Sequence, residues 1–234
     1  MRPVERGDPP LDTVSKLPIQ FREYGDAKPA LIERLGCYCS YCEQPILNQP
    51  AVEHVLSKSE HAQFERAWPN LLLACAVCNS IKGREHLAVQ DYFWPDRDNT
   101  LRAVSYGAGG TVTTGAGLSP DDYARGRRTI ELTGLDRHPA GDVEPSPRDS
   151  RWKQRLEVWE IALEMKADLR EQDTERMRRY IERLACSKGF WSVWMTVFAD
   201  DVDMRRRLIA AFPGTSRVCF DEQTCLVARP SGAL

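Results

Sequence analysis

Two pairs of cysteines in the first half of the chain have the spacing of metal ligands. Cys39 and Cys42 form one Cys-x-x-Cys pair, and Cys75 and Cys78 form another, with 32 residues between the pairs. The thiolates of two such pairs can close a tetrahedral shell around one Zn²⁺. Cys37 competes with Cys39 for a place in that shell, but the two-residue gap to Cys42 favours Cys39. We expect one structural zinc, with redox-active or packed thiols as the alternative.

A zinc bound in this way would fix the position of a second group of polar residues, Glu53, His54, Asn70 and Asn79. Each of them also has an ordinary structural role. A histidine on an apolar strand is often a core residue, and asparagine is common as a helix N-cap and in turns. Neighbouring residues on a strand point to opposite faces. Glu53 and His54 can therefore reach one site only where the strand ends or bends.

The segment that carries these residues predicts a short sequence of elements. The first cysteine pair forms a zinc knuckle, a buried strand covers residues 51–56, and a loop follows around Asn70. A second strand covers residues 71–74, and the second knuckle leads into a helix that opens at Cys78 or Asn79 and runs towards Lys82.

The rest of the chain is mostly helical in its pattern. Ser119 and Pro120 are an N-cap and first-turn pair, and residues 139–149, rich in Pro, Gly and charge, predict a linker. Residues 1–26 show no periodicity and are expected to lie on a surface as an arm. Further predicted elements are a helix at 27–35, a hairpin at 102–113, helices at 120–132, about 151–170, up to 189, within 190–198 and at 204–212, and small strands at 217–220 and 225–228.

The predicted helix over residues 151–170 has a stripe of large apolar residues at spacings of four, three and four. We expect this stripe to be buried. Its members are Trp152, Leu156, Trp159 and Leu163.

Composition places the chain among folded globular proteins. It has 234 residues, of which 42% are hydrophobic, but no apolar run of about 18 residues, and no apolar run follows the arginines of residues 1–10. We expect a cytoplasmic protein without membrane contact. In a reducing cytosol, paired cysteines indicate metal rather than disulfides, and Cys186, Cys219 and Cys225 are expected to be packed or free thiols.

Charge is balanced along the chain. Residues 1–102 contain 12 Lys and Arg against 14 Asp and Glu, and residues 103–234 contain 20 of each kind. Neither half has the basic excess of a protein that binds nucleic acid strongly by itself. If the substrate is a polyanion, a partner is expected to help hold it.

The order Cys-x-x-Cys, Glu-His, Asn, Cys-x-x-Cys-Asn, Lys resembles the zinc-stabilised HNH nuclease motif, the ββα-metal fold. The segments CSYCE, VEH, WPNLLLAC and CNSIKG, followed by WPDRDNT and TIELTGLDR, are similar to the PtuB-like HNH nucleases of Septu and retron anti-phage systems. The resemblance covers roughly residues 20–212. It departs from the family at Leu56-Ser57, before Lys58, where many relatives have a proline.

The resemblance implies an α+β fold in which a zinc-stabilised ββα-metal (HNH) nuclease core is followed by a mainly helical C-terminal domain. We divide the chain into residues 1–118, the HNH domain with its N-terminal arm and zinc site, and residues 119–234, a helical domain for partner docking.

The resemblance also implies roles for single residues. His54 would be the general base, and Glu53 and Asn79 would hold a catalytic Mg²⁺ or Mn²⁺. Asn70 would tie the loop that aims His54, and Lys82 would contact a phosphate, with a solvated lysine as the alternative.

The expected function is a metal-dependent endonuclease that acts as the effector of an anti-phage complex with a PtuA-like ATPase partner. DNA is the expected substrate, with structured RNA as an alternative. Two other functions stay open: a zinc-ribbon interaction module without catalysis, and a free-standing restriction-type DNA endonuclease.

Overall fold

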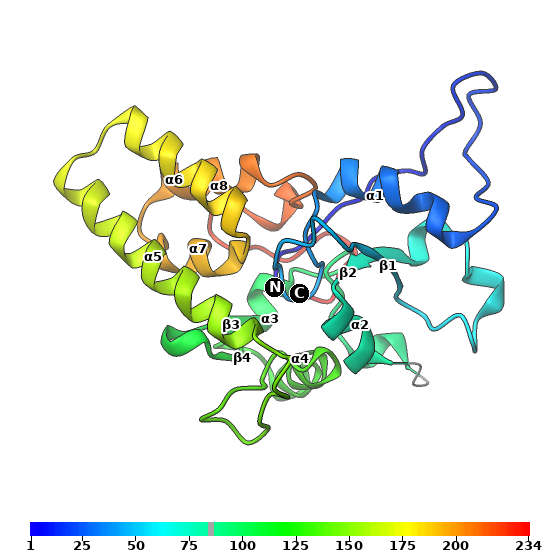
Figure 1. Cartoon of the computed structure of the whole chain (residues 1–234), viewed down its shortest axis with the longest axis horizontal. Helices are drawn as coiled ribbons and strands as arrows, with labels where there is room; N and C mark the ends of the chain where they lie inside the picture. Colours follow the sequence, from blue (N-terminus) through cyan, green and yellow to red (C-terminus); the bar gives the residue numbers. More distant parts are fainter. Residues whose placement is uncertain (84–86) are drawn as a thin grey trace.

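A two-stranded antiparallel sheet followed directly by a helix lies at the centre of the functional region. The computed structural model describes residues 1–83 and 87–234, and Figure 1 shows these elements beside each other. Strand β1 (Ala51–His54) pairs with β2 (Leu71–Ala74), so that Glu53 faces Leu72 and His54 faces Leu71. Helix α2 (Ala76–Lys82) follows. This is the predicted strand, strand and helix order, although β1 ends at His54 and not at residue 56 as predicted.

Helix α2 begins earlier than predicted. The sequence predicts a start at Cys78 or Asn79, but the first helical residue is Ala76. Cys75 is the N-cap, because its Sγ accepts a hydrogen bond from the backbone N–H of Cys78 at 3.3 Å. Asn79 therefore lies inside the helix and does not cap it, which leaves its side chain for another role.

A short helix supports the sheet, as predicted. A 3-10 turn (η1, Tyr24–Ala27) leads into α1 (Lys28–Leu35), which contacts β2. The helix ends at Gly36, whose positive φ of 72° is a conformation that glycine adopts without strain.

The prediction of a surface arm was wrong for the first residues of the chain. Met1 and Val4 are fully buried, and Val4 forms a β-bridge with Thr215. The side chain of Arg2 is also buried and donates to the carbonyl of Leu35 at 2.7 Å. Residues 11–18 do protrude, as the dark-blue loop in Figure 1 shows.

A second hairpin and a capped helix follow the HNH region. After α3 (Thr100–Ala103), β3 (Val104–Tyr106) and β4 (Val112–Thr114) pair across the turn η5 (Ala108–Gly110). Helix α4 (Pro120–Thr133) begins after Ser119, whose Oγ accepts from the backbone N–H of Asp122. Both elements agree with the prediction.

Four helices make up most of the remainder. They are α5 (Arg151–Glu171), α6 (Glu175–Lys188), α7 (Trp191–Val197) and α8 (Val202–Ala211). Trp191 and Trp194 on α7 are fully buried between their neighbours. Helix α5 packs against α7 and against η5. At Gly110 in that turn, a Cβ atom would lie 2.3 Å from the carbonyl oxygen of Trp152, so only glycine fits.

The predicted buried stripe of α5 is displaced by one position. Trp152, Leu156 and Trp159 are only half-buried, and Leu163 is 49% exposed. The face that is buried instead consists of Arg151, Arg155, Val158, Ala162 and Leu169. Two arginines thus occupy core positions at the start of this helix.

The tail does not form the two predicted strands. Residues 217–219 are a 3-10 turn (η6, Arg217–Cys219). Within residues 217–234, all of which the structure describes, a single β-bridge joins Phe220 to Leu226. Short turns complete the described chain: η2 (Ala62–Phe64), η3 (Trp68–Asn70) and η4 (Val89–Asp91).

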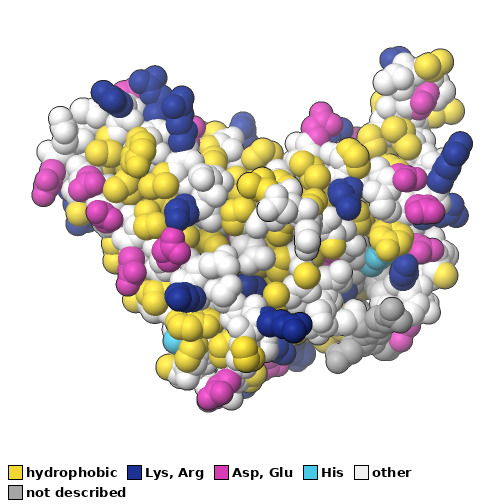
Figure 2. All heavy atoms as spheres, viewed as in Figure 1, with side chains coloured by type: hydrophobic (Ala, Val, Ile, Leu, Met, Phe, Trp, Pro, Cys, Tyr) yellow, Lys and Arg dark blue, Asp and Glu magenta, His cyan; other side chains and the backbone are white. Residues whose placement is uncertain are grey.

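Buried apolar side chains from both halves of the chain form one continuous core. Acidic and basic side chains are both scattered over the face in Figure 2, which agrees with the balanced charge of the sequence. Among residues 1–83 and 87–234, no helix combines the length and apolar character needed to cross a bilayer.

Candidate active site and metal centre

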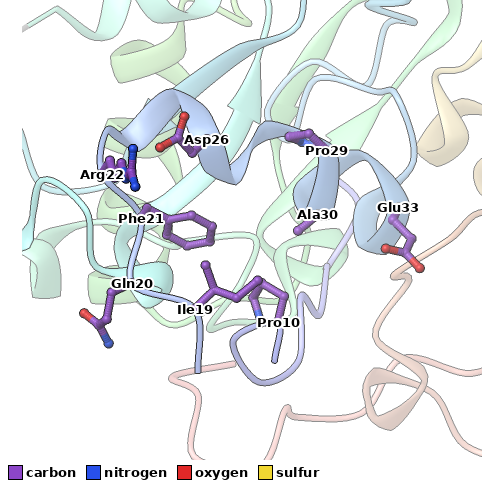
Figure 3. Close-up of a pocket in the computed structure, with 9 residues that line it drawn as sticks. All are labelled: Pro10, Ile19, Gln20, Phe21, Arg22, Asp26, Pro29, Ala30 and Glu33. Atoms are coloured by element: carbon purple, nitrogen blue, oxygen red, sulfur yellow. The ribbon is translucent and has the colours of Figure 1, made fainter. Parts of the chain in front are cut away.

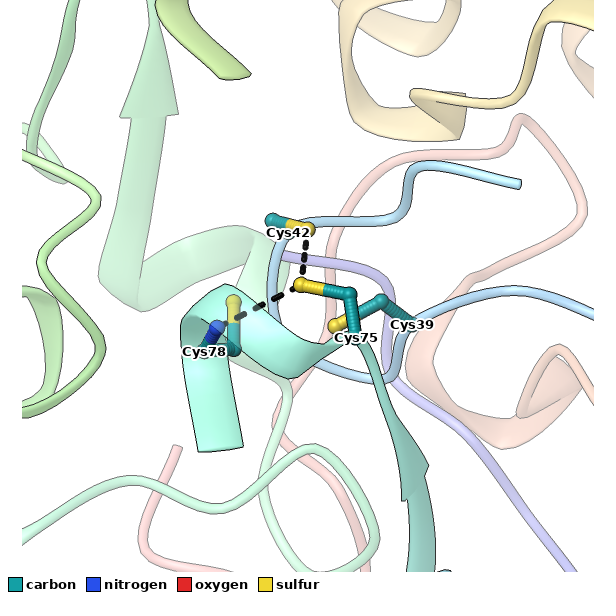
Figure 4. Close-up of side chains that lie close together, drawn as sticks. All are labelled: Cys39, Cys42, Cys75 and Cys78. Atoms are coloured by element: carbon teal, nitrogen blue, oxygen red, sulfur yellow. Dashed lines mark hydrogen bonds between the residues drawn. The ribbon is translucent and has the colours of Figure 1, made fainter. Parts of the chain in front are cut away.

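The four paired cysteines meet at one point. Their sulfur atoms all lie within 4.8 Å of one another, and Cys42 Sγ is 3.7 Å from Cys75 Sγ. A tetrahedral Zn²⁺ with Zn–S bonds of about 2.3 Å places its sulfurs about 3.8 Å apart. Figure 4 shows the four side chains converging from the first knuckle and from the junction of β2 and α2. The donor set and its spacing fit a structural zinc.

The burial of this cluster also indicates a cation. All four side chains are at most 3% exposed. Burial raises the pKa of the Cys78 thiol, because an isolated thiolate is costly away from water. Four sulfurs so close together can all ionise only when a metal ion balances them. Cys37 lies outside the cluster, as predicted, and Cys186, Cys219 and Cys225 are free.

Glu53 points into the protein and pairs with a lysine. Its carboxylate is 3% exposed, and its Oε1 lies 2.9 Å from Lys82 Nζ and 3.4 Å from Tyr41 Oη. Burial raises the pKa of Glu53, while the nearby ammonium of Lys82 opposes that rise. Lys82 also donates to the backbone carbonyl of His54 at 2.7 Å. The carboxylate is therefore held at the end of β1 facing a cation.

Lys82, for which a phosphate contact is predicted, is buried and paired. Its side chain is 2% exposed and is engaged by Glu53 and by the carbonyl of His54. Its ammonium group already has an anionic partner in the carboxylate of Glu53. In this arrangement, Lys82 holds Glu53 and the end of β1.

The imidazole of His54 lies on the other face of the strand end. It is half-buried, and its Nε2 is 2.9 Å from the backbone carbonyl oxygen of Glu65. A carbonyl can only accept, so Nε2 carries the proton of the neutral ring and Nδ1 has the free lone pair. The ring of Tyr24 packs edge-on at a centroid distance of 4.8 Å.

The surroundings favour the neutral form of His54. Burial is the main cause that lowers its pKa below the usual 6.5, and the cations Lys58 and Lys82 act in the same direction. The carbonyl and the charge of Glu65 oppose them. The outcome is an unprotonated nitrogen at neutral pH.

Asn70 closes the loop between the two strands. Its buried amide makes three hydrogen bonds: Oδ1 accepts from Leu56 N at 2.7 Å, and Nδ2 donates to the carbonyls of Leu56 at 3.0 Å and Phe64 at 3.1 Å. The amide thus joins the start of the loop to the residue before Glu65. It fixes the carbonyl that holds His54.

Asn79 lies on the same face of α2 as Lys82, three residues away. It is half-buried, and its side-chain amide makes no hydrogen bond with any residue in the described ranges. Oxygens of a carboxylate and of a free amide suit a hard divalent cation. Apart from the cysteines, the described residues contain no group of three His, Asp or Glu side chains placed to share a metal ion.

Sequence reasoning missed three residues that complete the site. Tyr41 lies inside the first cysteine pair, where the spacing assigns it no role, although its hydroxyl contacts Glu53. Glu65 acts through its backbone carbonyl, for which side-chain identity gives no signal. Tyr24 comes from a segment in which the sequence shows no periodicity.

A separate pocket between the protruding loop and α1 is not this site. It has a volume of about 460 Å³ and is lined mainly by apolar groups, among them Pro10, Ile19, Phe21 and Pro29 (Figure 3). Its charged members, Arg22, Asp26 and Glu33, include no metal-binding set within the described chain.

One comparison with known protein families concerns this region. Residues 39–85 match the family described as HNH endonuclease, and the last two matched positions lie outside the described residues. No curated protein matches the chain. The match begins at the first cysteine of the cluster and covers β1, β2 and α2. It confirms the prediction of an HNH core within an α+β fold.

Proposed function

We propose that this chain, in which residues 39–85 form an HNH endonuclease domain, cleaves nucleic-acid phosphodiester bonds with His54 as the general base and with a divalent cation held by Glu53 and Asn79. The HNH domain implies nuclease activity. The observation that best supports the role of His54 is the 2.9 Å contact between its Nε2 and the carbonyl of Glu65.

The base must take a proton from the attacking water at cellular pH. His54 is suited to this step in two respects, because its pKa is lowered, mainly by burial, and because its proton is committed to the Glu65 carbonyl through Nε2. The free nitrogen is Nδ1. The hydrogen bond also fixes the plane of the ring, and Asn70 fixes the carbonyl.

The other residues position an anion and a polar group for the cation. When bound, Mg²⁺ or Mn²⁺ would neutralise the charge that builds on the phosphate and on the leaving oxygen. Glu53 offers its carboxylate and Asn79 its amide oxygen. Lys82 contacts both the carboxylate of Glu53 and the backbone carbonyl of His54. It thereby fixes the Glu53 carboxylate relative to the backbone of His54, although the two side chains lie on opposite faces of β1.

Cleavage assays test this function and its zinc-ribbon alternative together. We expect purified protein with Mn²⁺ or Mg²⁺ to nick plasmid DNA, and His54→Ala to abolish nicking while zinc content and melting temperature stay unchanged. His61→Ala is the matched control, since His61 lies in the same loop region and, in the described part of the chain, has no contact with the side chains of Glu53, His54, Asn70 or Asn79. Full nicking by His54→Ala would contradict the role of His54, and absence of nicking by the wild-type protein would favour a binding module.

We further propose that this nuclease works as the effector of an anti-phage complex with an ATPase-type partner. The resemblance of residues 20–212 to PtuB-like nucleases and the balanced charge of both halves support this context. A protein that relies on a partner should bind DNA weakly alone. Binding measured against salt separates this from a free-standing endonuclease, which would bind tightly by itself with a steep salt dependence. Parallel assays with structured RNA decide the substrate.

A further inference from the structure

An arginine from the helical part of the chain contacts the cysteine cluster. Arg151, the first residue of α5, places its Nη1 3.0 Å from Cys78 Sγ, although 73 residues separate the two in sequence. The side chain is 2% exposed. A guanidinium N–H pointing at a sulfur in this setting is a charge-assisted hydrogen bond to a thiolate.

Every donor of this guanidinium has a partner. Asp149 receives two of the five hydrogen bonds, from Nε at 2.8 Å and from Nη2 at 2.7 Å. The carbonyls of Thr133 and Gly134 at the end of α4 each accept one at 2.8 Å, and Cys78 Sγ accepts the fifth. Because the guanidinium is planar and rigid and all five of its N–H groups are hydrogen-bonded, the direction of each N–H is fixed.

The electrostatics explain why a cation belongs at this point. Four thiolates outweigh the charge of Zn²⁺, so the loaded centre is a buried anion that needs compensation. Arg151 provides a positive charge directly at one sulfur. The Asp149 carboxylate cancels that charge at longer range, so its contribution is to orient the guanidinium.

We propose that Arg151 is an outer-sphere ligand of the zinc centre, and that metal occupancy thereby holds the end of α4 and the start of α5 against the HNH domain. This inference is independent of the proposed function, because it involves neither substrate nor His54. Coupling of this kind is reciprocal: the Arg151 contact should slow zinc loss, and zinc loss should loosen α5 at its start.

The chain contains a matched control one turn further along α5. Arg155 is equally buried and donates to the carbonyls of Gly110 at 3.0 Å and Leu135 at 3.1 Å, but it has no contact with sulfur among the described residues. Replacing Arg155 therefore removes a buried guanidinium and its packing while leaving the zinc ligands as they are.

Zinc release from the loaded full-length protein to a chromogenic chelator tests the proposal. We expect Arg151→Met to release zinc at least about 10-fold faster than wild type, and Arg155→Met to release it at close to the wild-type rate even if both variants lose thermal stability. Equal release rates for the two variants would overturn the proposal, since Arg151 would then contribute only packing.

A spectroscopic measurement adds a readout that packing alone does not move. In Co²⁺-loaded protein, the thiolate-to-metal charge-transfer band should shift to longer wavelength in Arg151→Met but not in Arg155→Met, because a sulfur without its hydrogen bond gives up an electron more easily. If Arg151→Met does not fold, Asp149→Asn takes its place, since it keeps the arginine but weakens its orientation. Asp149→Asn should also release zinc faster than Arg155→Met, and an unchanged rate would contradict the proposal.

Discussion

The imidazole of His54 is positioned by a backbone carbonyl, with no acidic side chain of the described residues bonded to the ring. Glu65 O accepts from Nε2, and Asn70 holds the residue before Glu65. Residue type and spacing in the sequence predicted His54, Glu53 and Asn70 as members of one site. They could not predict the carbonyl, because any amino acid provides one and only the folded loop decides which is used.

The lowered pKa of His54 predicts the pH dependence of cleavage. Activity needs the neutral ring, and burial together with Lys58 and Lys82 makes protonation harder than in a free histidine. The rate should therefore stay on its plateau as pH falls past 6.5 and decline only below that value. Single-turnover rates across pH measure this.

A variant sharpens the same test. Lys58→Met removes one of the cations that lower the pKa of His54. The pH below which the cleavage rate declines should therefore rise towards 6.5. A wild-type rate that already declines above pH 6.5 would contradict this account of the base. So would a decline that begins at a lower pH in Lys58→Met than in the wild type.

The buried pair of Glu53 and Lys82 predicts a stability effect. Lys82→Met leaves the carboxylate of Glu53 buried without its cation, which should reduce the free energy of unfolding by about 3–5 kcal/mol. Adding Glu53→Gln should restore part of the loss. Urea unfolding measures both, and Lys58→Met, which breaks an exposed pair with Glu65, is the control with an expected change of at most about 1 kcal/mol. If the double variant Lys82→Met, Glu53→Gln is no more stable than Lys82→Met alone, the loss of stability does not come from the unpaired carboxylate of Glu53.

At the scale of elements, local signals predicted some boundaries correctly, whereas β1 ends at His54, two residues before its predicted end. The apolar run at residues 71–74 became β2 with the same bounds, and Ser119 caps α4 as its sequence position indicated. Helix α2 was misplaced because cysteine is not a usual N-cap. Here the sulfur of Cys75 takes that role as part of the metal knuckle.

The loop between β1 and β2 depends on the amide of Asn70. Asn70→Ala removes three hydrogen bonds and leaves partly buried backbone groups without partners, so stability should fall by about 1–3 kcal/mol. Hydrogen exchange should rise in residues 56–66, and cleavage should slow because the Glu65 carbonyl is no longer fixed. Asn48→Ala changes an exposed asparagine near the first knuckle and should alter neither. Unchanged exchange in Asn70→Ala would show that the loop is held by other contacts.

At the scale of the whole molecule, long-range contacts account for what the sequence did not predict. Buried Met1 and Val4 lie against segments more than 90 residues away, as in the bridge from Val4 to Thr215. The periodicity of α5 indicated its aromatic stripe, but Arg151 and Arg155 occupy the core because carbonyls and a sulfur far along the chain accept their hydrogen bonds. The spacing of residues within a helix cannot reveal hydrogen-bond acceptors that lie in distant segments of the chain.

The zinc centre ties these segments together, so its loss should affect the whole fold. Cys75→Ser should reduce bound zinc below one equivalent and lower the melting temperature markedly, because a structural zinc contributes its binding energy to folding. Cys225→Ser is the control, since Cys225 is exposed and lies outside the cluster. Metal analysis with thermal unfolding checks both, and a melting temperature unchanged in Cys75→Ser would remove zinc from the account.

Chemical rescue of His54→Gly tests the central claim most directly. If the imidazole of His54 removes the proton from the attacking water, His54→Gly should lose cleavage in the presence of Mn²⁺, and free imidazole added to the assay should restore part of the rate. Nicking by His54→Gly at the wild-type rate without imidazole would contradict the claim.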